Sequence, residues 1–319
     1  MKGKFFTLLF FTILSFVIFS KIRIKTKIEN LKTDKEVENF IKSFHKKKYA
    51  KFKIFKFKEY KGEGEICKKI ADSLNITKSF YKVDFDNNGL TDILVIGKYY
   101  GLNIFVVMDF GENNLKLYNL KKNYFPYCIV PKISKIGNKT VINYYYEKEH
   151  SWLNLKKKFE IIKKTWVYKF GDFVEYNYNP KEYNIEKIEY ETTPCFGFCS
   201  VFTIKIDQSK NAIFNAKMYN RKGRKGKEIK GIFQTKIKEN DYSKIVQLLN
   251  YIDFPNLKDN YSVGWTCDQS CILTVTYNNG KVKKINDYGL KGTSGLINLY
   301  GLMFNLRFNQ DWKKKQSEQ

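Results

Sequence analysis

The stretch ILTVTYNNGKVKKI at residues 272–285 carries the clearest structural signal in the chain. Apolar and β-branched residues flank Asn278-Asn279-Gly280, and Asn-Gly between two such runs is the strongest short signal for a β-hairpin. Four strand-like runs precede it, at 185–191, 201–206, 212–219 and 227–237, followed by a helical stripe at 241–251. A last helix is expected to start near Thr293 or Ser294. This order predicts an α+β unit over residues 185–312, in which two helices cover an antiparallel sheet.

The first half of the chain is predicted to be a β-rich domain with one or two helices. Thr33 and Glu36 form a candidate capping box for one helix, and a second short helix is expected over 65–74. From Ser79 to about Tyr178, aromatic and β-branched runs alternate with turn residues, which predicts a meander of strands. The polar segment 177–181 carries a proline and separates the two blocks. The predicted organisation is therefore residues 30–178, residues 185–312 and a tail at 313–319.

The first twenty residues have the layout of a signal peptide. Lys2 and Lys4 precede an apolar run at 5–19, and the small residue Ser20 follows it. The run is short for a membrane-spanning helix, which needs about 20 apolar residues. Basic residues from Lys21 onward oppose translocation, so an uncleaved N-terminal anchor is the alternative. We expect an exported protein, located in the periplasm, at the outer membrane or outside the cell.

The chain is strongly basic, with 58 Lys and Arg against 32 Asp and Glu and a net charge of +26. Few of the basic residues are arginine, whereas recognition of phosphates and bases favours the bidentate guanidinium group. The charge is therefore interpreted as a solvated lysine surface rather than a nucleic-acid interface. One basic loop contains Arg221, Arg224 and the neighbouring lysines Lys222, Lys225 and Lys227, and it is a candidate contact for an anionic surface or polymer.

The run DFDNNGLTD at residues 84–92 has the spacing of a calcium-binding loop. It places oxygen ligands at alternating positions around a glycine: Asp84, Asp86, Asn88, the Leu90 carbonyl and Asp92. Val95 occupies the position at which an EF-hand needs glutamate, so the loop is not an EF-hand. It resembles instead the calcium loops in FG-GAP repeat proteins. The loop predicts a structural Ca²⁺ site, and the alternative is an ordinary hairpin turn, which the same residue types also form.

Four of the six cysteines form two C-x3-C pairs, Cys195/Cys199 and Cys267/Cys271. In an oxidising compartment they predict one or two disulfides, with three pairings open. A zinc site with four thiolates is the alternative, but the compact zinc knuckles that usually accompany it are missing. A catalytic Cys195 has no nearby base, since both histidines, His45 and His150, lie in the other block. Cys67 and Cys128 are expected to be buried or unpaired thiols.

Two motifs of the second block, TPCFGFC at 193–199 and DYGLKGT at 287–293, are followed by Leu299-Tyr300, Leu306-Arg307, Gln310 and Trp312. In this order they resemble a bacterial family of domains of unknown function, family 6438. The resemblance implies an exported or lipid-anchored envelope protein with no assigned activity. Ser200 stands where many relatives have proline, and the second cysteine pair is peculiar to this chain, so the family's disulfide pattern is not carried over.

The second motif also has a physical interpretation. Gly289 and Gly292 suit a turn into the last helix, Thr293 suits its N-cap, and Asp287 is expected to pair with Arg307.

Taken together, these patterns predict a non-enzymatic binding or scaffolding protein of the cell envelope, whose partner is another envelope protein or an anionic polymer. No catalytic residue is predicted. One alternative is a thiol- or carboxylate-dependent enzyme centred on Cys195, Cys199 and Asp287. Another is a protein that binds an anionic polymer or a membrane surface through its lysines.

Overall fold

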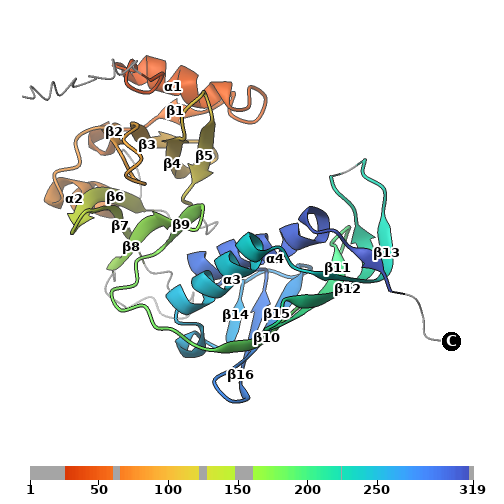
Figure 1. Ribbon diagram of the computed structural model, residues 1–319. Coiled ribbons are helices and arrows are strands. Elements are labelled where there is room, and N and C mark those ends of the chain that lie inside the picture. The colour runs from red at the N-terminus through yellow and green to blue at the C-terminus, as the bar shows by residue number, and fades with distance from the viewer. Residues whose placement is uncertain (1–25, 60–64, 122–127, 148–160, 224, 316–319) are drawn as a thin grey trace, which may run out of the picture.

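The computed structural model describes residues 26–59, 65–121, 128–147, 161–223 and 225–315. Most of the regular structure is strand, and the described chain contains three sheets and four α-helices. The α+β class expected from the sequence is confirmed. Figure 1 shows the first two sheets grouped together and the third sheet, with two helices, beside them.

The first sheet has five strands and is covered by a helix on each face. Its helices are α1 (Asp34–Ser43) and α2 (Glu65–Ser73), and its strands are β1 (Lys53–Ile54), β2 (Phe80–Val83), β3 (Asp92–Lys98), β4 (Leu102–Asp109) and β5 (Leu115–Asn119). The predicted capping box is present, because Thr33 Oγ1 accepts from Glu36 N and Glu36 Oε2 accepts from Thr33 N. Strand β4 is buried along its whole length, as expected for a strand with both faces covered.

The second sheet has four strands, so the predicted meander is divided between two sheets. Its strands are β6 (Ile129–Ile136), β7 (Lys139–Glu147), β8 (Ile161–Lys169) and β9 (Asp172–Glu175), paired antiparallel in chain order. Cys67 of α2 forms a disulfide with Cys128, just before β6. Both cysteines are buried, as expected, but the expectation that they are unpaired was wrong, because the packing of α2 against β6 brings the two Cα atoms to 5.1 Å.

The third sheet has eight strands in the order β14-β16-β15-β10-β11-β12-β13-β17. Their bounds are β10 (Ile185–Thr192), β11 (Val201–Asp207), β12 (Asn211–Asn220), β13 (Ile229–Lys236), β14 (Asn260–Ser262), β15 (Ser270–Tyr277), β16 (Lys281–Tyr288) and β17 (Lys313–Lys314). All neighbours are antiparallel except β14 and β16. Lys313 and Lys314, expected in a tail, instead pair with β13.

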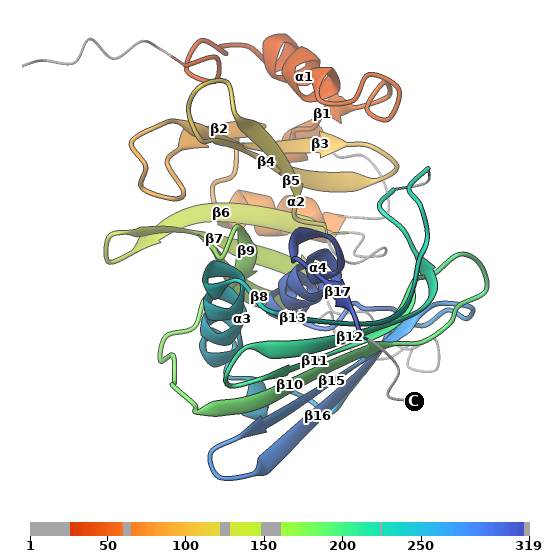
Figure 2. The same ribbon diagram turned by 45° about the vertical axis from the view of Figure 1, so that its right-hand side comes forward.

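Helices α3 (Glu239–Tyr251) and α4 (Ser294–Asn309) pack on one face of this sheet. Figure 2 shows the resulting layers, with α1 outermost, then the first and second sheets, then α3 and α4, and finally the eight-stranded sheet. The core between helices and sheet contains Tyr190, Phe202 and Phe214 from the strands and Leu299 and Met303 from α4. On the opposite sheet face, β10 carries charged side chains such as Glu189, which pairs with Lys187 and Lys205.

The second sheet is joined to α4 through a carboxylate. Glu175 of β9 accepts hydrogen bonds from Ser294 N at 2.7 Å and Gly295 N at 2.9 Å, at the start of α4. A carboxylate is favourable there because it satisfies free N–H groups and complements the positive end of the helix dipole. Asn177 adds a second link, donating from its side-chain amide to the Tyr251 carbonyl at 2.6 Å.

Candidate functional site

The acidic loop connects β2 to β3, and the structure brings three of its predicted ligands together. Carboxylate oxygens of Asp84, Asp86 and Asp92 lie within 4.8 Å of one another. This convergence follows from the hairpin, because Val83 and Asp92 are paired across the strands and the intervening residues turn back on themselves. Three carboxylates at one point form a hard oxygen site of the kind that Ca²⁺ prefers.

Burial and hydrogen bonding differ between these carboxylates. Asp92 is fully buried and accepts from Phe85 N and Asp109 N, both at 2.8 Å, and burial raises its pKa to about 7. Burial also raises the pKa of Asp86. Asp84 accepts from Gly89 N through Oδ2, whereas its Oδ1 atom is buried and has no hydrogen-bond partner. A buried carboxylate oxygen without a donor suits a cation, so the donor set fits Ca²⁺.

Asn88, the remaining side-chain ligand predicted, takes part in the turn itself. Its Oδ1 accepts from Leu90 N at 2.7 Å, and its amide nitrogen donates to the Asp109 carbonyl at 2.8 Å. The bond to Asp109 ties the loop to the end of β4. The bond from Leu90 N is an Asx-turn contact that an ordinary hairpin turn would also use.

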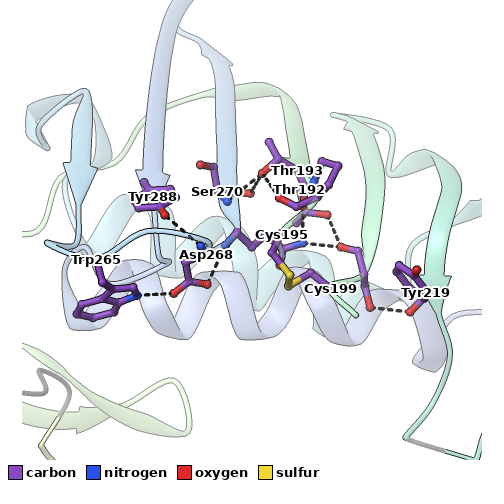
Figure 3. The surroundings of a disulfide bond; sticks show 12 residues. Thr192, Thr193, Cys195, Cys199, Tyr219, Trp265, Asp268, Ser270 and Tyr288 are labelled. Carbon is purple, nitrogen blue, oxygen red and sulfur yellow. Dashed lines mark hydrogen bonds between the residues drawn. A yellow bond between two sulfur atoms is a disulfide. The ribbon is translucent and has the colours of Figure 1, made fainter. Parts of the chain in front are cut away.

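The second candidate site is the loop between β10 and β11, which we call the aromatic loop (residues 195–199). A disulfide between Cys195 and Cys199 closes it, as Figure 3 shows. Phe196 and Phe198 are 90% and 79% exposed. Between them, Gly197 has a φ of +142°, a backbone conformation that other residues rarely adopt.

The base of the aromatic loop is fixed by a hydrogen-bond network. Thr193 exchanges two bonds with Ser270: its N donates to the Ser270 carbonyl, and its Oγ1 accepts from Ser270 N, both at 3.0 Å. Gln269 donates from its side chain to the carbonyls of Thr193 and Ser200, at 2.7 and 2.8 Å. Phe196 N donates to the Cys267 carbonyl at 3.3 Å. The exposed phenyl groups therefore stand on a braced support, of which Figure 3 shows the contact between Thr193 and Ser270 beside the disulfide.

The two other cysteines of the C-x3-C pairs are free thiols in different surroundings. Cys267 is exposed, whereas Cys271 is buried on β15, where burial raises the pKa of its thiol to about 12. The second predicted disulfide is therefore absent between them. A centre of four thiolates would need the two sulfurs that the Cys195–Cys199 bond already uses.

The DYGLKGT motif builds the junction between β16 and α4. Asp287 is fully buried, and its carboxylate accepts from Lys291 N at 3.1 Å and Gly292 N at 2.8 Å. Burial raises the pKa of this carboxyl group. Gly292 has no room for a side chain, since a Cβ atom there would lie 2.7 Å from Asp287 Oδ2. Thr293 is the N-cap of α4, as predicted, and accepts from Leu296 N.

The expected pairing of Asp287 with Arg307 is wrong. Arg307 donates to Asn220 Oδ1 at 3.0 Å, and its guanidinium group lies 4.5 Å from the ring centroid of Phe202. Aromatic faces and an amide oxygen thus compensate the buried cation. Both oxygens of Asp287 accept from backbone N–H groups, so this carboxylate holds the junction together.

The structure places the residues of the enzymatic alternative in a disulfide and in the core. The sulfurs of Cys195 and Cys199 are bonded to each other, and Asp287 is sealed in the core. His45 follows α1 and accepts from Lys48 N, while His150 lies outside the described residues. Of the two predicted anion contacts, Arg221 lies in the turn after β12, and Arg224 is outside the described residues.

The exposure of Phe196 and Phe198 is the feature that sequence reasoning missed. Apolar residues are expected inside, and the signal available was their position between two cysteines four residues apart. An open pocket of about 500 Å³ was also not predicted; it lies beside Glu175 and Tyr251 and includes Tyr178 and Asp253 in its lining.

Residues 186–307 match the family described as "Domain of unknown function (DUF6438)". The match runs from β10 into α4 and includes both the aromatic loop and the Asp287 junction. No curated protein and no solved structure matches the chain. Among the described residues, every helix is too short or too polar to cross a membrane.

Proposed function

We propose that this chain is an exported envelope protein that binds a partner through the aromatic loop and is not an enzyme. The observation that carries the proposal is the exposure of Phe196 and Phe198 on a disulfide-closed support. Large apolar side chains held in water are typical of binding surfaces, because contact with a partner removes their apolar area from solvent. The disulfide and the hydrogen bonds below it hold the rings in place beforehand, which lowers the entropic cost of binding.

Export is supported by two independent features. The first twenty residues have the layout of a signal peptide, and disulfides such as Cys195–Cys199 persist mainly in oxidising compartments.

A photo-reactive phenylalanine analogue at position 196 tests the binding function in intact cells. We expect it to form discrete cross-links to a partner molecule, because the side chain at this position projects into solvent from the rigid aromatic loop. The matched control places the same analogue at Ile213, which is 41% exposed on the open sheet face. If position 196 yields no more cross-linked product than position 213, the proposal is wrong.

We further propose that the acidic loop binds a structural Ca²⁺ ion. Asp84, Asp86 and Asp92 would supply carboxylate oxygens, with Asn88 and the Leu90 carbonyl completing the set predicted from spacing. The buried Asp84 Oδ1 atom, which lacks a donor, supports this proposal. A bound ion would stabilise the β2–β3 hairpin, whose Leu94 and Phe80 belong to the cores on either side of the first sheet.

Calcium is therefore expected to raise the melting temperature of the protein. With free Ca²⁺ at one hundred times its dissociation constant, binding to the native state alone adds about 2.7 kcal/mol to the free energy of unfolding. The measurement is thermal unfolding in EGTA and in excess CaCl₂, with Mg²⁺ as the ion control. Asp84→Asn should abolish most of the shift, whereas Asp72→Asn, at an exposed position in α2, should preserve it. Equal melting curves with EGTA and calcium would rule the site out.

A further inference from the structure

We infer that the aromatic loop, together with the basic turn beside it, docks on the surface of an anionic lipid bilayer. This inference rests on the proposed binding function and names its partner. The basic turn comprises residues 221–223 and 225–227, between β12 and β13. Its described basic residues are Arg221, Lys222, Lys225 and Lys227.

The two surfaces adjoin at Tyr219. The rings of Phe198 and Tyr219 are in edge contact, with centroids 5.4 Å apart. Ser200, the residue after the aromatic loop, donates from its hydroxyl to the Tyr219 carbonyl at 2.8 Å. Arg221 N donates to the same carbonyl at 3.1 Å. Exposed apolar rings and basic side chains are thus fixed next to each other at one end of the eight-stranded sheet, the end where the β12–β13 turn projects in Figure 2.

The charge of this surface is predominantly positive. Three acidic residues also lie near it: Glu228 accepts from Tyr219 N at 2.7 Å, Glu191 pairs with Lys217 at 3.3 Å, and Asp268 accepts from Trp265 Nε1 at 3.0 Å. The basic residues are more numerous: Arg221, Lys222, Lys225, Lys227 and Lys217. Met218, which precedes Tyr219 in the chain, is 41% exposed. The patch therefore contains exposed apolar side chains and a majority of basic ones.

A bilayer surface offers what this combination needs. Aromatic side chains are stabilised at the boundary between head groups and acyl chains, and basic side chains are attracted by anionic head groups in the same plane. A soluble polyanion would satisfy the basic turn but leave Phe196 and Phe198 in water. Neither the aromatic rings nor the basic side chains alone would give stable attachment, since membrane binding usually requires an apolar and an electrostatic contribution together.

The test measures binding of the full chain to phosphatidylcholine vesicles with and without phosphatidylglycerol, by flotation. Phe196→Ser/Phe198→Ser is expected to lower the partition coefficient on anionic vesicles by at least about tenfold, because two apolar rings no longer leave water. Arg221→Gln/Lys222→Gln should lower it by about tenfold on anionic vesicles at low salt, and it should have little effect on neutral ones.

Two control variants match these changes elsewhere. Ile213→Ser/Ile232→Ser removes two side chains that are 41% and 46% exposed on the open sheet face, and Lys281→Gln/Lys284→Gln removes two positive charges from the β15–β16 hairpin. Both controls should bind anionic vesicles like the parent chain. Equal losses in controls and test variants would show a general effect of charge or hydropathy and would overturn the inference.

A local measurement separates this loop from the apolar run at residues 5–19, which could bind vesicles by itself. Tryptophan introduced as Phe198→Trp should be quenched by brominated lipids beyond the quenching of the parent chain. Absence of that extra quenching overturns the membrane inference even if the chain floats with vesicles. If cross-links from position 196 to a protein persist in that case, the binding function stands and only the lipid partner is wrong.

Discussion

Replacing Cys67 and Cys128 together by alanine is expected to lower the free energy of unfolding by about 4 kcal/mol. The two cysteines are 61 residues apart in sequence, and cross-linking a loop of that length removes about this much chain entropy, expressed as free energy, from the unfolded state. The link also joins α2 to the second sheet, beside the core that contains Leu94 and Ile142. The measurement is urea unfolding of the oxidised protein, followed by circular dichroism.

The matched control is Cys195→Ala/Cys199→Ala. The sequence separation there is only 4 residues, for which the same relation gives about 2 kcal/mol. Alanine is preferred to serine because Cys67 and Cys128 are fully buried and a hydroxyl would need a new partner. A smaller loss for the Cys67/Cys128 variant than for the control would show that this cross-link does not constrain the unfolded chain as proposed.

Local signals predicted the elements of the second half well. The hairpin around Asn278-Asn279-Gly280 and the N-cap at Thr293 depend on residues that lie close together in sequence, so their effect does not require knowledge of the rest of the fold. The convergence of Asp84, Asp86 and Asp92 is predictable for the same reason, because the spacing within one turn determines it.

Contacts between residues far apart in the sequence could not be predicted from local patterns. Pairing of Cys67 with Cys128 depends on α2 lying against β6, and no periodic pattern states which helix covers which sheet. The same limit explains the error at Arg307. Charge complementarity suggested Asp287, but the packing of α4 places the guanidinium group on aromatic rings and leaves Asp287 to the backbone of its own junction.

The two candidate sites also differ in how far local sequence determines them. The carboxylates of the acidic loop converge within one hairpin. The aromatic loop is braced at its base by Ser270 of β15 and by the preceding residue, Gln269, which lie 77 and 76 residues from Thr193 in the chain. The family match covers the aromatic loop and the Asp287 junction together. A rigid junction and a rigid loop at the same end of the sheet are consistent with a domain whose role is to present a surface.

Asp287→Ala is expected to lower the free energy of unfolding by about 3 kcal/mol. The change leaves Lys291 N and Gly292 N without their acceptor, and an unsatisfied buried donor costs about 1–3 kcal/mol. Urea unfolding measures the loss. Asp259→Ala is the control: its carboxylate is largely exposed and pairs with Lys283, so its loss should cost less than about 1 kcal/mol.

The variant Gly292→Ala tests separately whether the Asp287 carboxylate packs directly against Gly292. A Cβ atom at position 292 would lie 2.7 Å from Asp287 Oδ2, 3.0 Å from Leu296 Cδ1 and 3.2 Å from Tyr261 Cγ. Because Asp287→Ala removes the nearest of these atoms, the double variant should lose less stability than the sum of the two single variants, by about 1 kcal/mol. Strict additivity would contradict direct packing of the carboxylate against Gly292. Stability that is nearly unchanged in Asp287→Ala would contradict the role of this carboxylate in holding the junction.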